Sequence, residues 1–184
     1  MPMAVLTTSR KTSNRVRSFV RDLSSVLPDT ERFNRGSMNS TELVARIQHS
    51  DAKMALIVTL WKGNPGTIQF ISRTGSELLT VKVESAALRR EVSSRKGLRV
   101  QSVHAVTIPK KITKQGRYLA DFIAALVDLE VAESDMPVIT ESEGTNKVEI
   151  RIEDLGSGKI LWTHFHALDG EEIGPRIRVI GLQR

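Results

Sequence analysis

Apolar residues recur along parts of this chain at intervals of three and four, the spacing of one face of an amphipathic helix. The first such stretch runs from about residue 13 to 27, with the inward positions Val16, Phe19, Val20, Leu23, Val26 and Leu27. Thr12 or Ser13 can cap the start of this helix, and Pro28 follows its end. A second stretch spans about 114–130, with the inward positions Leu119, Phe122, Ile123, Leu126 and Val127.

The segments between these helices have the patterns of strands. Residues 53–61 are almost continuously apolar, which predicts a strand buried on both faces. The other expected strands are a short run near the start, residues 31–36, and the segments 67–73, 78–85, 98–108, 147–154, 159–167 and 175–182. A helix is expected at about 39–48, with Asn39 or Ser40 as its cap and Glu42 at the capping-box position. The remaining expectations are a turn at 62–66, helical turns within 86–94 and an acidic stretch of low order at 133–146.

The two halves of the chain resemble each other. When Thr8 is set over Thr107, about twenty residues align without a gap, so that Lys11 falls on Lys110 and Phe19 on Tyr118. Each half then reads as a strand, a helix with a basic start and a meander of strands. We therefore predict an α/β protein with a single domain, 1–184, made of two pseudo-repeated lobes at about 1–97 and 98–184 that share a mixed sheet.

Composition narrows the class of protein. Of 184 residues, 40% are hydrophobic and only 4% aromatic, and there is no cysteine, which excludes disulfides and thiol catalysis. No apolar run approaches the ~18 residues of a membrane helix, so no membrane partner is expected. Residues 1–100 contain 17 Lys and Arg against 8 Asp and Glu, a balance of +9, whereas residues 101–184 contain 10 against 13, a balance of −3. This asymmetry favours a polyanionic partner for the first half.

A basic cluster surrounds the start of the first helix. Its members are Arg10, Lys11, Arg15, Arg17 and Arg21. The first turn of a helix favours acids, yet none precedes Asp22, so cations here are unfavourable unless an anion binds. The hydroxyls of Ser9, Thr12 and Ser13 could also donate to phosphate oxygens. The alternative is that these residues form only a solvated helix face.

Three further groups of cations extend this candidate phosphate-binding surface. Arg32, Asn34 and Arg35 are expected to join the first cluster from a neighbouring strand. A loop follows with Arg89, Arg90, Arg95, Lys96 and Arg99, of which Arg95 and Lys96 are the candidates for wrapping a phosphate backbone. In the second half, Lys110, Lys111 and Lys114, with Arg117, mirror the first cluster, but acids follow soon after. We expect the first lobe to have the stronger footprint for a polyanion.

Aromatic residues offer few platforms for base stacking. Phe19, Phe70 and Phe122 fit the core, which leaves the candidates Phe33, Trp61, Trp162 and Tyr118. Each of these four is also expected more often in a core than on a surface. The sequence therefore favours contacts to phosphate and RNA shape over readout of bases.

No catalytic constellation emerges from the sequence. Gly156-Ser157-Gly158-Lys159 lacks the first glycine and the final Ser or Thr of a Walker loop, which predicts a hairpin turn instead. His164 and His166 share a strand face near Asp169, but two histidines without a third placed ligand are weak grounds for a metal site. We expect no enzyme activity, no cofactor and no metal; a metal-dependent nuclease that uses His164 or His166 is a remote alternative.

The run TTSRKTSNRVRSFVRDLSSVLP, followed by RFNRG and the GNPG hairpin, resembles the Brix-domain family over essentially the whole chain, most closely its small archaeal members. The resemblance implies two lobes that are each similar to the anticodon-binding domain of class II aminoacyl-tRNA synthetases. It also implies pre-ribosomal RNA binding and assembly without catalysis. The residues that match its motifs are Thr8, Ser9, Arg10, Lys11, Arg15, Arg17, Ser18, Asn34, Arg35 and Gly36.

Charge pattern and resemblance together predict a non-enzymatic factor in ribosome biogenesis. It would bind rRNA or pre-rRNA and assist rRNA processing or subunit assembly, with ribosomal or assembly proteins as further partners. The alternative is a protein–protein scaffold, whose acidic second half docks a basic ribosomal protein without direct RNA contact. A cytoplasmic location is expected, or a nucleolar one in a eukaryotic source.

Overall fold

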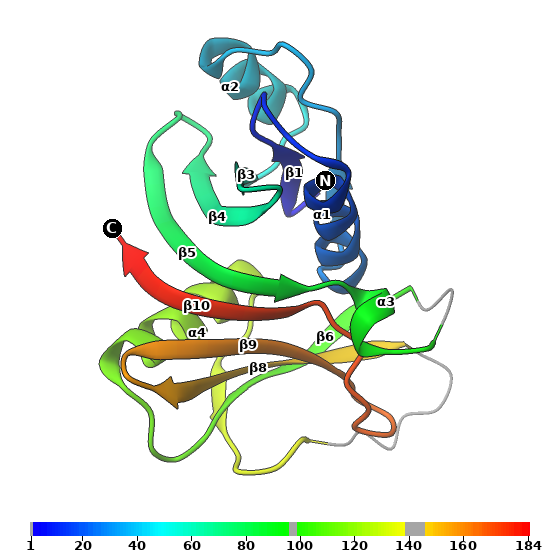
Figure 1. The fold of residues 1–184 in the computed structure, drawn as a ribbon, viewed down its shortest axis with the longest axis vertical. Helices are drawn as coiled ribbons and strands as arrows, with labels where there is room; N and C mark the ends of the chain where they lie inside the picture. Colours follow the sequence, from blue (N-terminus) through cyan, green and yellow to red (C-terminus); the bar gives the residue numbers. More distant parts are fainter. Residues whose placement is uncertain (1, 96–98, 139–145) are drawn as a thin grey trace.

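The computed structural model describes residues 2–95, 99–138 and 146–184 and shows an α/β fold built on one large mixed sheet (Figure 1). In the described residues ten strands follow the order β2-β1-β3-β4-β5-β10-β9-β8-β6-β7. The predicted fold class, an α/β protein with a mixed sheet, is confirmed at this level. The sheet curves strongly, so that β5 and β10 bend alongside each other through the middle of the molecule in Figure 1.

The first half of the chain contains five strands and three helices among its described residues. Its elements are β1 (Ala4–Thr8), α1 (Asn14–Val26), β2 (Thr30–Arg32), α2 (Ser40–His49), β3 (Met54–Trp61), β4 (Asn64–Ser72), β5 (Glu77–Ala87) and α3 (Arg89–Val92). β1 is parallel to both of its neighbours, β2 and β3, and β3, β4 and β5 then form an antiparallel meander.

The second half follows the same sequence of pairings with one helix. Its elements are β6 (Ser102–Ile108), α4 (Lys114–Leu126), β7 (Val131–Glu133), β8 (Lys147–Gly156), β9 (Lys159–His166) and β10 (Arg176–Gln183). β6 is parallel to both β7 and β8, and β8, β9 and β10 are antiparallel. Antiparallel pairing of β5 with β10 joins the two halves into one sheet.

The helices that open the two halves lie 100 residues apart, not at the expected offset of 99. α1 and α4 have 13 residues each, and their caps are Ser13 and Thr113. The buried positions shared at this spacing are 16, 19, 20, 23 and 26 in α1 and 116, 119, 120, 123 and 126 in α4. Phe19 therefore corresponds to Leu119 and not to Tyr118. The offset of 99 matched identical threonines, whereas caps and inward-facing positions fix the phase of a helix.

The sheet buries apolar side chains on both faces of the first half. Leu56 and Val58 of β3 belong to the main core with α1 and α4, and the alternate residues Ala55 and Ile57 pack with α2. Strand side chains alternate between faces, so the continuous apolar run of β3 follows from cover on both sides, as predicted. The expected capping box of α2 is present: Asn39 accepts from Glu42 N at 2.9 Å, and Glu42 accepts from Asn39 N at 2.8 Å.

Several element bounds differ from those expected. β2 ends at Arg32, so residues 33–36 lie beyond the strand, and α4 ends at Leu126, not near 130. The β3–β4 turn contains only Lys62 and Gly63, both with positive φ, and Pro65 lies within β4 at a register shift. The strand β7 was not expected, since three residues carry too little periodicity to be recognised. Part of the acidic stretch, 139–145, lies outside the described residues.

Candidate nucleic-acid interface

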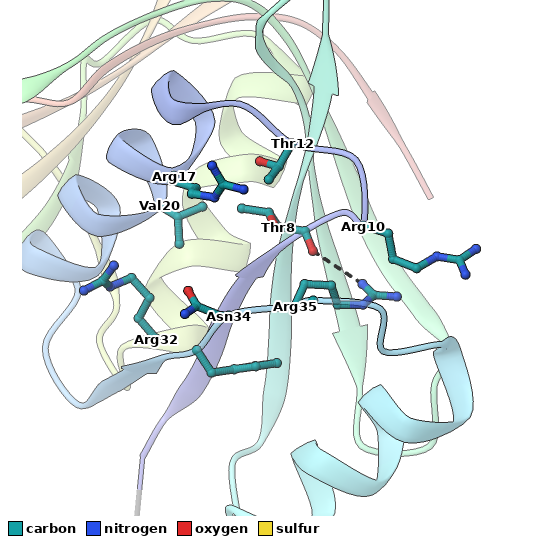
Figure 2. Close-up of a pocket in the computed structure, with 10 residues that line it drawn as sticks. Thr8, Arg10, Thr12, Arg17, Val20, Arg32, Asn34 and Arg35 are labelled. Atoms are coloured by element: carbon teal, nitrogen blue, oxygen red, sulfur yellow. Dashed lines mark hydrogen bonds between the residues drawn. The ribbon is translucent and has the colours of Figure 1, made fainter.

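A pocket of about 400 Å³ opens where β1 ends, α1 begins and the chain leaves β2. In Figure 2, Arg10 and Arg35 lie at one end of this pocket and Arg32 at the other, with Thr8 and Asn34 between them. The lining residues are Thr8, Arg10, Thr12, Arg17, Val20, Arg32, Phe33, Asn34, Arg35 and Gly36. Seven of the predicted site residues therefore meet here: Thr8, Arg10, Arg17, Arg32, Asn34, Arg35 and the motif residue Gly36. We call this site the arginine pocket.

Local backbone geometry places these side chains. α1 starts at its cap Ser13, whose hydroxyl accepts from Val16 N at 3.1 Å, so Arg17 projects from the first turns of the helix. Beyond β2 the segment 33–36 returns toward β1: Phe33 N donates to Leu6 O at 3.0 Å, and Gly36 takes a φ of +55°. Arg35 is held there because its Nε donates to Met38 O at 2.7 Å.

The charges of the arginine pocket are not compensated. It holds four arginines, and no carboxylate in the described part of the chain lines it. The one side-chain hydrogen bond of Arg17 in the described residues goes to the neutral amide of Asn14, at 3.1 Å. Burial, and secondly the nearby charge of Arg10, hold the pKa of Arg35 below its usual value. The first turn of α1 contains no acid, so the positive end of the helix dipole adds to the same field.

A second pocket, of about 440 Å³, extends this basic surface along α1. Both pockets are lined by Arg32, and the second adds Arg21 and Arg99, with Asp29 as an acidic neighbour. Arg21 was a predicted site residue. Arg99 had been grouped with the 89–99 loop, but the fold brings it to α1, a relationship across more than seventy residues that no local pattern shows. We call the two pockets together the arginine track.

The hydroxyls that were expected to donate to phosphate are mostly engaged within the protein. Ser9 Oγ donates to Lys11 O at 2.6 Å, and Ser13 Oγ donates to Gly63 O at 2.8 Å. Thr8 Oγ1 donates to Ser9 O at 2.9 Å. By contrast, Thr12 Oγ1 is buried in the wall of the arginine pocket and has no hydrogen-bond partner among the described residues.

Arg15 was predicted to contact RNA, but it forms a salt bridge within the protein. Its Nη1 and Nη2 lie 2.5 and 3.2 Å from the two carboxylate oxygens of Glu91, and Nη2 also donates to Ala86 O at 2.8 Å. The hydrogen bond from Arg15 lowers the pKa of Glu91, and the same bond raises the pKa of Arg15. Glu91 stands 76 residues away in the chain, so the α1 sequence contains no sign of this pair.

In the 89–99 loop, too, carboxylates of the protein neutralise a cation that was predicted to contact phosphate. Arg95 pairs with Asp169 and, at 2.8 Å from Nε, with Glu171. Lys96 lies outside the described residues. Arg95 is therefore neutralised within the protein and does not belong with the uncompensated arginines.

The corresponding pocket of the second half is partly neutralised. It measures about 430 Å³ and is lined by Lys110, Lys114 and Arg117 together with Asp121 and Glu133. Arg117 Nε lies 3.1 Å from Asp121, and its Nη1 lies 4.0 Å from Glu133. The predicted site residues of this half, Lys110, Lys111 and Lys114, are exposed. This pocket therefore has three cations and two carboxylates in its lining, whereas the arginine pocket has four cations and no carboxylate among the described residues.

The candidate stacking platforms differ in exposure. Trp162 is buried, and Phe33 is half-buried with Arg46 5.2 Å from its ring centroid. Tyr118 is half-buried with Arg184 4.2 Å from its ring centroid. Trp61 is the exception to the expected core position, because 66% of it is exposed.

The histidines considered for a metal site have structural partners. His164 is fully buried; its Nε2 accepts from Trp162 Nε1 at 3.0 Å, and its Nδ1 lies 2.7 Å from Pro175 O. His166 Nδ1 lies 3.2 Å from Arg95 and 3.3 Å from Asp169. In the described ranges no three His, Asp or Glu side chains group as metal ligands. The predicted hairpin turn is present: Gly156 ends β8 and Ser157 and Gly158 form the turn, all three with positive φ.

Fold and site together define an α/β protein with a large mixed sheet and, near one edge of it, a pocket of four arginines that no carboxylate of the described residues lines. No model of a known protein family matches the chain. Among curated proteins, a probable Brix domain-containing ribosomal biogenesis protein from Aeropyrum pernix is 30% identical over 178 residues, which cover 95% of this chain and 93% of that protein. The chain therefore belongs to the Brix-domain family, as its motifs indicated.

Further relatives and solved structures agree with this assignment. A protein with the same description from Thermococcus kodakarensis is 24% identical over 186 residues, covering 96% of this chain and 89% of that one. The crystal structure of the probable ribosomal biogenesis protein from Aeropyrum pernix superimposes with a TM-score of 0.74 at 27% identity, over 97% and 96% of the two chains. The archaeal Imp4-like protein Mil shares the fold, with a TM-score of 0.66 at 21% identity over 97% and 98%. Among the described residues no helix is long and apolar enough to cross a membrane.

Proposed function

We propose that this Brix-domain protein is a non-enzymatic RNA-binding factor of ribosome biogenesis, which binds rRNA or pre-rRNA through the arginine track. In this proposal it positions RNA during subunit assembly or rRNA processing in the cytoplasm. The names of its curated relatives support a role in ribosome biogenesis, since they describe ribosomal biogenesis proteins. The charge and geometry of the arginine pocket support RNA as the ligand.

The observation that carries the proposal is the set of four arginines around one pocket, which no carboxylate of the described ranges lines. Like charges that share a partly desolvated site repel one another, and an anion removes that cost. Guanidinium groups bind phosphate in a planar, two-pronged geometry, which makes arginine suited to a nucleic-acid backbone. Thr12 Oγ1, buried and unpartnered among the described residues, is a further polar atom in the same wall.

The length of the track favours a polymer over a small anion. The two pockets measure about 400 and 440 Å³ and share Arg32, so cations continue along α1 beyond a single phosphate site. Successive phosphates of an RNA strand fit such a row, and contacts to phosphate position RNA without reading its sequence.

A duplicated origin for the chain is part of the same proposal. Identical orders of pairing in the two halves, and helices 100 residues apart with matching caps, support two pseudo-repeated lobes. In this interpretation each lobe keeps the architecture of an anticodon-binding domain, and Asp121 and Glu133 have weakened the second basic pocket.

Filter binding with rRNA fragments at two salt concentrations tests the proposal. Release of counterions on phosphate binding predicts an affinity that falls steeply as salt rises. Absence of salt-sensitive binding would overturn the proposal and favour the scaffold function. The same mixtures, incubated with divalent metal, test the absence of catalysis: RNA cleavage that is lost on changing His164 or His166 would contradict a non-enzymatic role.

The scaffold alternative has one observation in its favour. Two acidic residues of the second half, Asp121 and Glu133, line its pocket and could face a basic ribosomal or assembly protein. Changing both residues to amides should then abolish capture of a basic ribosomal protein, while RNA binding through the arginine track would remain.

A further inference from the structure

An exposed tryptophan stands at the tip of a hairpin next to the start of α1. Trp61 is the last residue of β3, and 66% of it is exposed, which is unusual for so large an apolar side chain. Lys62 and Gly63 form the turn, and Gly63 O accepts a hydrogen bond from Ser13 Oγ at 2.8 Å. The tip is thus tied to the helix cap, one residue after Thr12 of the arginine pocket.

The backbone beneath Trp61 is shaped to hold it in place. Gly66 of β4 lies so close that a Cβ atom there would stand 2.8 Å from Trp61 Cβ and 3.4 Å from Trp61 N. Only glycine permits this approach. The neighbouring Thr59 and Thr67 hydroxyls are hydrogen-bonded at 2.7 Å, which closes the irregular end of the hairpin. Because this backbone is already ordered, less conformational entropy is lost when a ligand contacts the ring.

The tip of the corresponding hairpin of the second half, residues 155–159, has no aromatic residue. β8 ends at Gly156, and Ser157 and Gly158 form the turn with φ of +54° and +77°, close to the +47° and +81° of Lys62 and Gly63. Of these two hairpin tips, the one with an aromatic residue therefore lies in the half whose basic pocket is not neutralised.

We propose that Trp61 is a stacking platform for an unpaired base of the RNA whose backbone occupies the arginine track. This inference rests on the proposed function and adds to it that the preferred ligand is single-stranded. The faces of bases and of indole stack, whereas a paired base inside a duplex is covered on both faces. Lys62 Nζ lies over one face of the ring, 5.5 Å from its centroid, so the base would stack on the opposite face and the cation would lie near that nucleotide's phosphate.

Three probes separate stacking from charge: a 12-nucleotide single-stranded RNA, a blunt duplex of the same sequence, and heparin, a polyanion without bases. We expect Trp61→Ala to weaken single-strand binding by about 5- to 100-fold, the range of one lost stacked base. Duplex and heparin affinities should change less than about 2-fold, because phosphate contacts remain. Trp61→Phe should retain part of the single-strand affinity. Tryptophan fluorescence of the unchanged protein should be quenched by the single strand and not by heparin.

Leu155→Ala is the matched control, since Leu155 is 40% exposed beside the tip of the corresponding hairpin. It should leave all three affinities unchanged, and far-UV circular dichroism should show every variant folded. Equal losses on all three probes, or none, would overturn the stacking proposal, as would a monomer–dimer shift on changing Trp61. If Arg10→Gln/Arg17→Gln abolishes binding while Trp61→Ala does nothing, only the stacking proposal fails. If the unchanged protein binds no RNA, both proposals fail.

Discussion

Arg10 and Arg35 line the same pocket with no carboxylate among its described residues, and the charge of Arg10 helps to lower the pKa of Arg35. Burial is the larger cause of that shift. The pair is therefore held together by the fold and not by mutual attraction. Such an arrangement is typical of functional sites, whose side chains often make the folded protein less stable than other side chains at the same positions would.

Arg10→Gln should separate stability from binding. The change removes a repulsive charge and, since Arg10 is exposed with no ion pair in the described residues, should leave the free energy of unfolding within about 0.5 kcal/mol or raise it slightly. RNA affinity should fall at the same time. Urea unfolding and RNA titration at one low salt concentration measure the two effects. A clear loss of stability would show that Arg10 has a structural role instead.

Removal of acids from the second pocket should increase RNA binding. Asp121→Asn combined with Glu133→Gln frees Arg117, which now lies 3.1 and 4.0 Å from those carboxylates. We expect affinity for an rRNA fragment to rise several-fold at low salt, with a steeper salt dependence. Glu84→Gln combined with Glu172→Gln is the control for net charge, because it also removes two negative charges and these residues pair with Lys159 and Arg176, away from this pocket. An equal gain in both proteins would show a general charge effect and contradict the pocket's role.

Arg15 should matter for stability and little for RNA. A double-mutant cycle on Arg15→Gln and Glu91→Gln should give a coupling of about 0.5–1 kcal/mol at pH 7, within the range for half-exposed pairs. The arginine lowers the pKa of Glu91, so this coupling should persist above the carboxyl's ordinary value of 4.5 and disappear as pH falls through its lower folded value. A large, specific loss of RNA affinity with Arg15→Gln would instead return this residue to the RNA site.

His164 should make stability depend on pH between about 4 and 6.5. Pro175 O can only accept, so Nδ1 carries the proton, and Nε2 accepts from Trp162. Burial lowers the pKa of this imidazole from 6.5 to about 4, and the unfolded chain therefore binds a proton first. Stability is complete above the unfolded value and should fall by about 3 kcal/mol as pH drops to the folded value.

Urea unfolding at several pH values checks this prediction. His164→Asn should flatten the dependence, whatever its effect on stability at pH 7. His49→Asn, at an exposed position at the end of α2, is the matched control and should keep it. A flat profile in the unchanged protein would contradict the neutral, buried imidazole.

Local features were predictable from the sequence because they depend on neighbours in the chain. The capping box of Asn39 and Glu42 and the buried stripe of α1 depend on side chains three or four residues apart. The buried strand β3 was predictable because cover on both faces leaves no polar position in its middle. These elements place the arginine pocket at the start of α1, where the cations had been expected.

Pairings between distant segments were beyond local patterns. Glu91 neutralises Arg15 and Asp169 neutralises Arg95, each from more than seventy residues away, so sequence alone placed both arginines in the RNA site. Trp61 was expected more often in a core, but the fold leaves it exposed next to the cap of α1. Arg99 had been grouped with the 89–99 loop, and the fold brings it to a pocket along α1. Which charges remain uncompensated is a property of tertiary structure.

The salt dependence of RNA affinity in two matched quadruple variants tests the central claim most directly. The first changes Arg10, Arg17, Arg32 and Arg35 to Gln; the second changes Lys110, Lys111, Lys114 and Arg117 to Gln. For an rRNA fragment, the slope of log affinity against log salt should become shallower by about 3 in the first variant, since each lost phosphate contact contributes about 0.7–0.9. It should change by less than about 1 in the second. Equal slopes in the two variants, or a slope unchanged by the first, would contradict RNA binding through the arginine pocket.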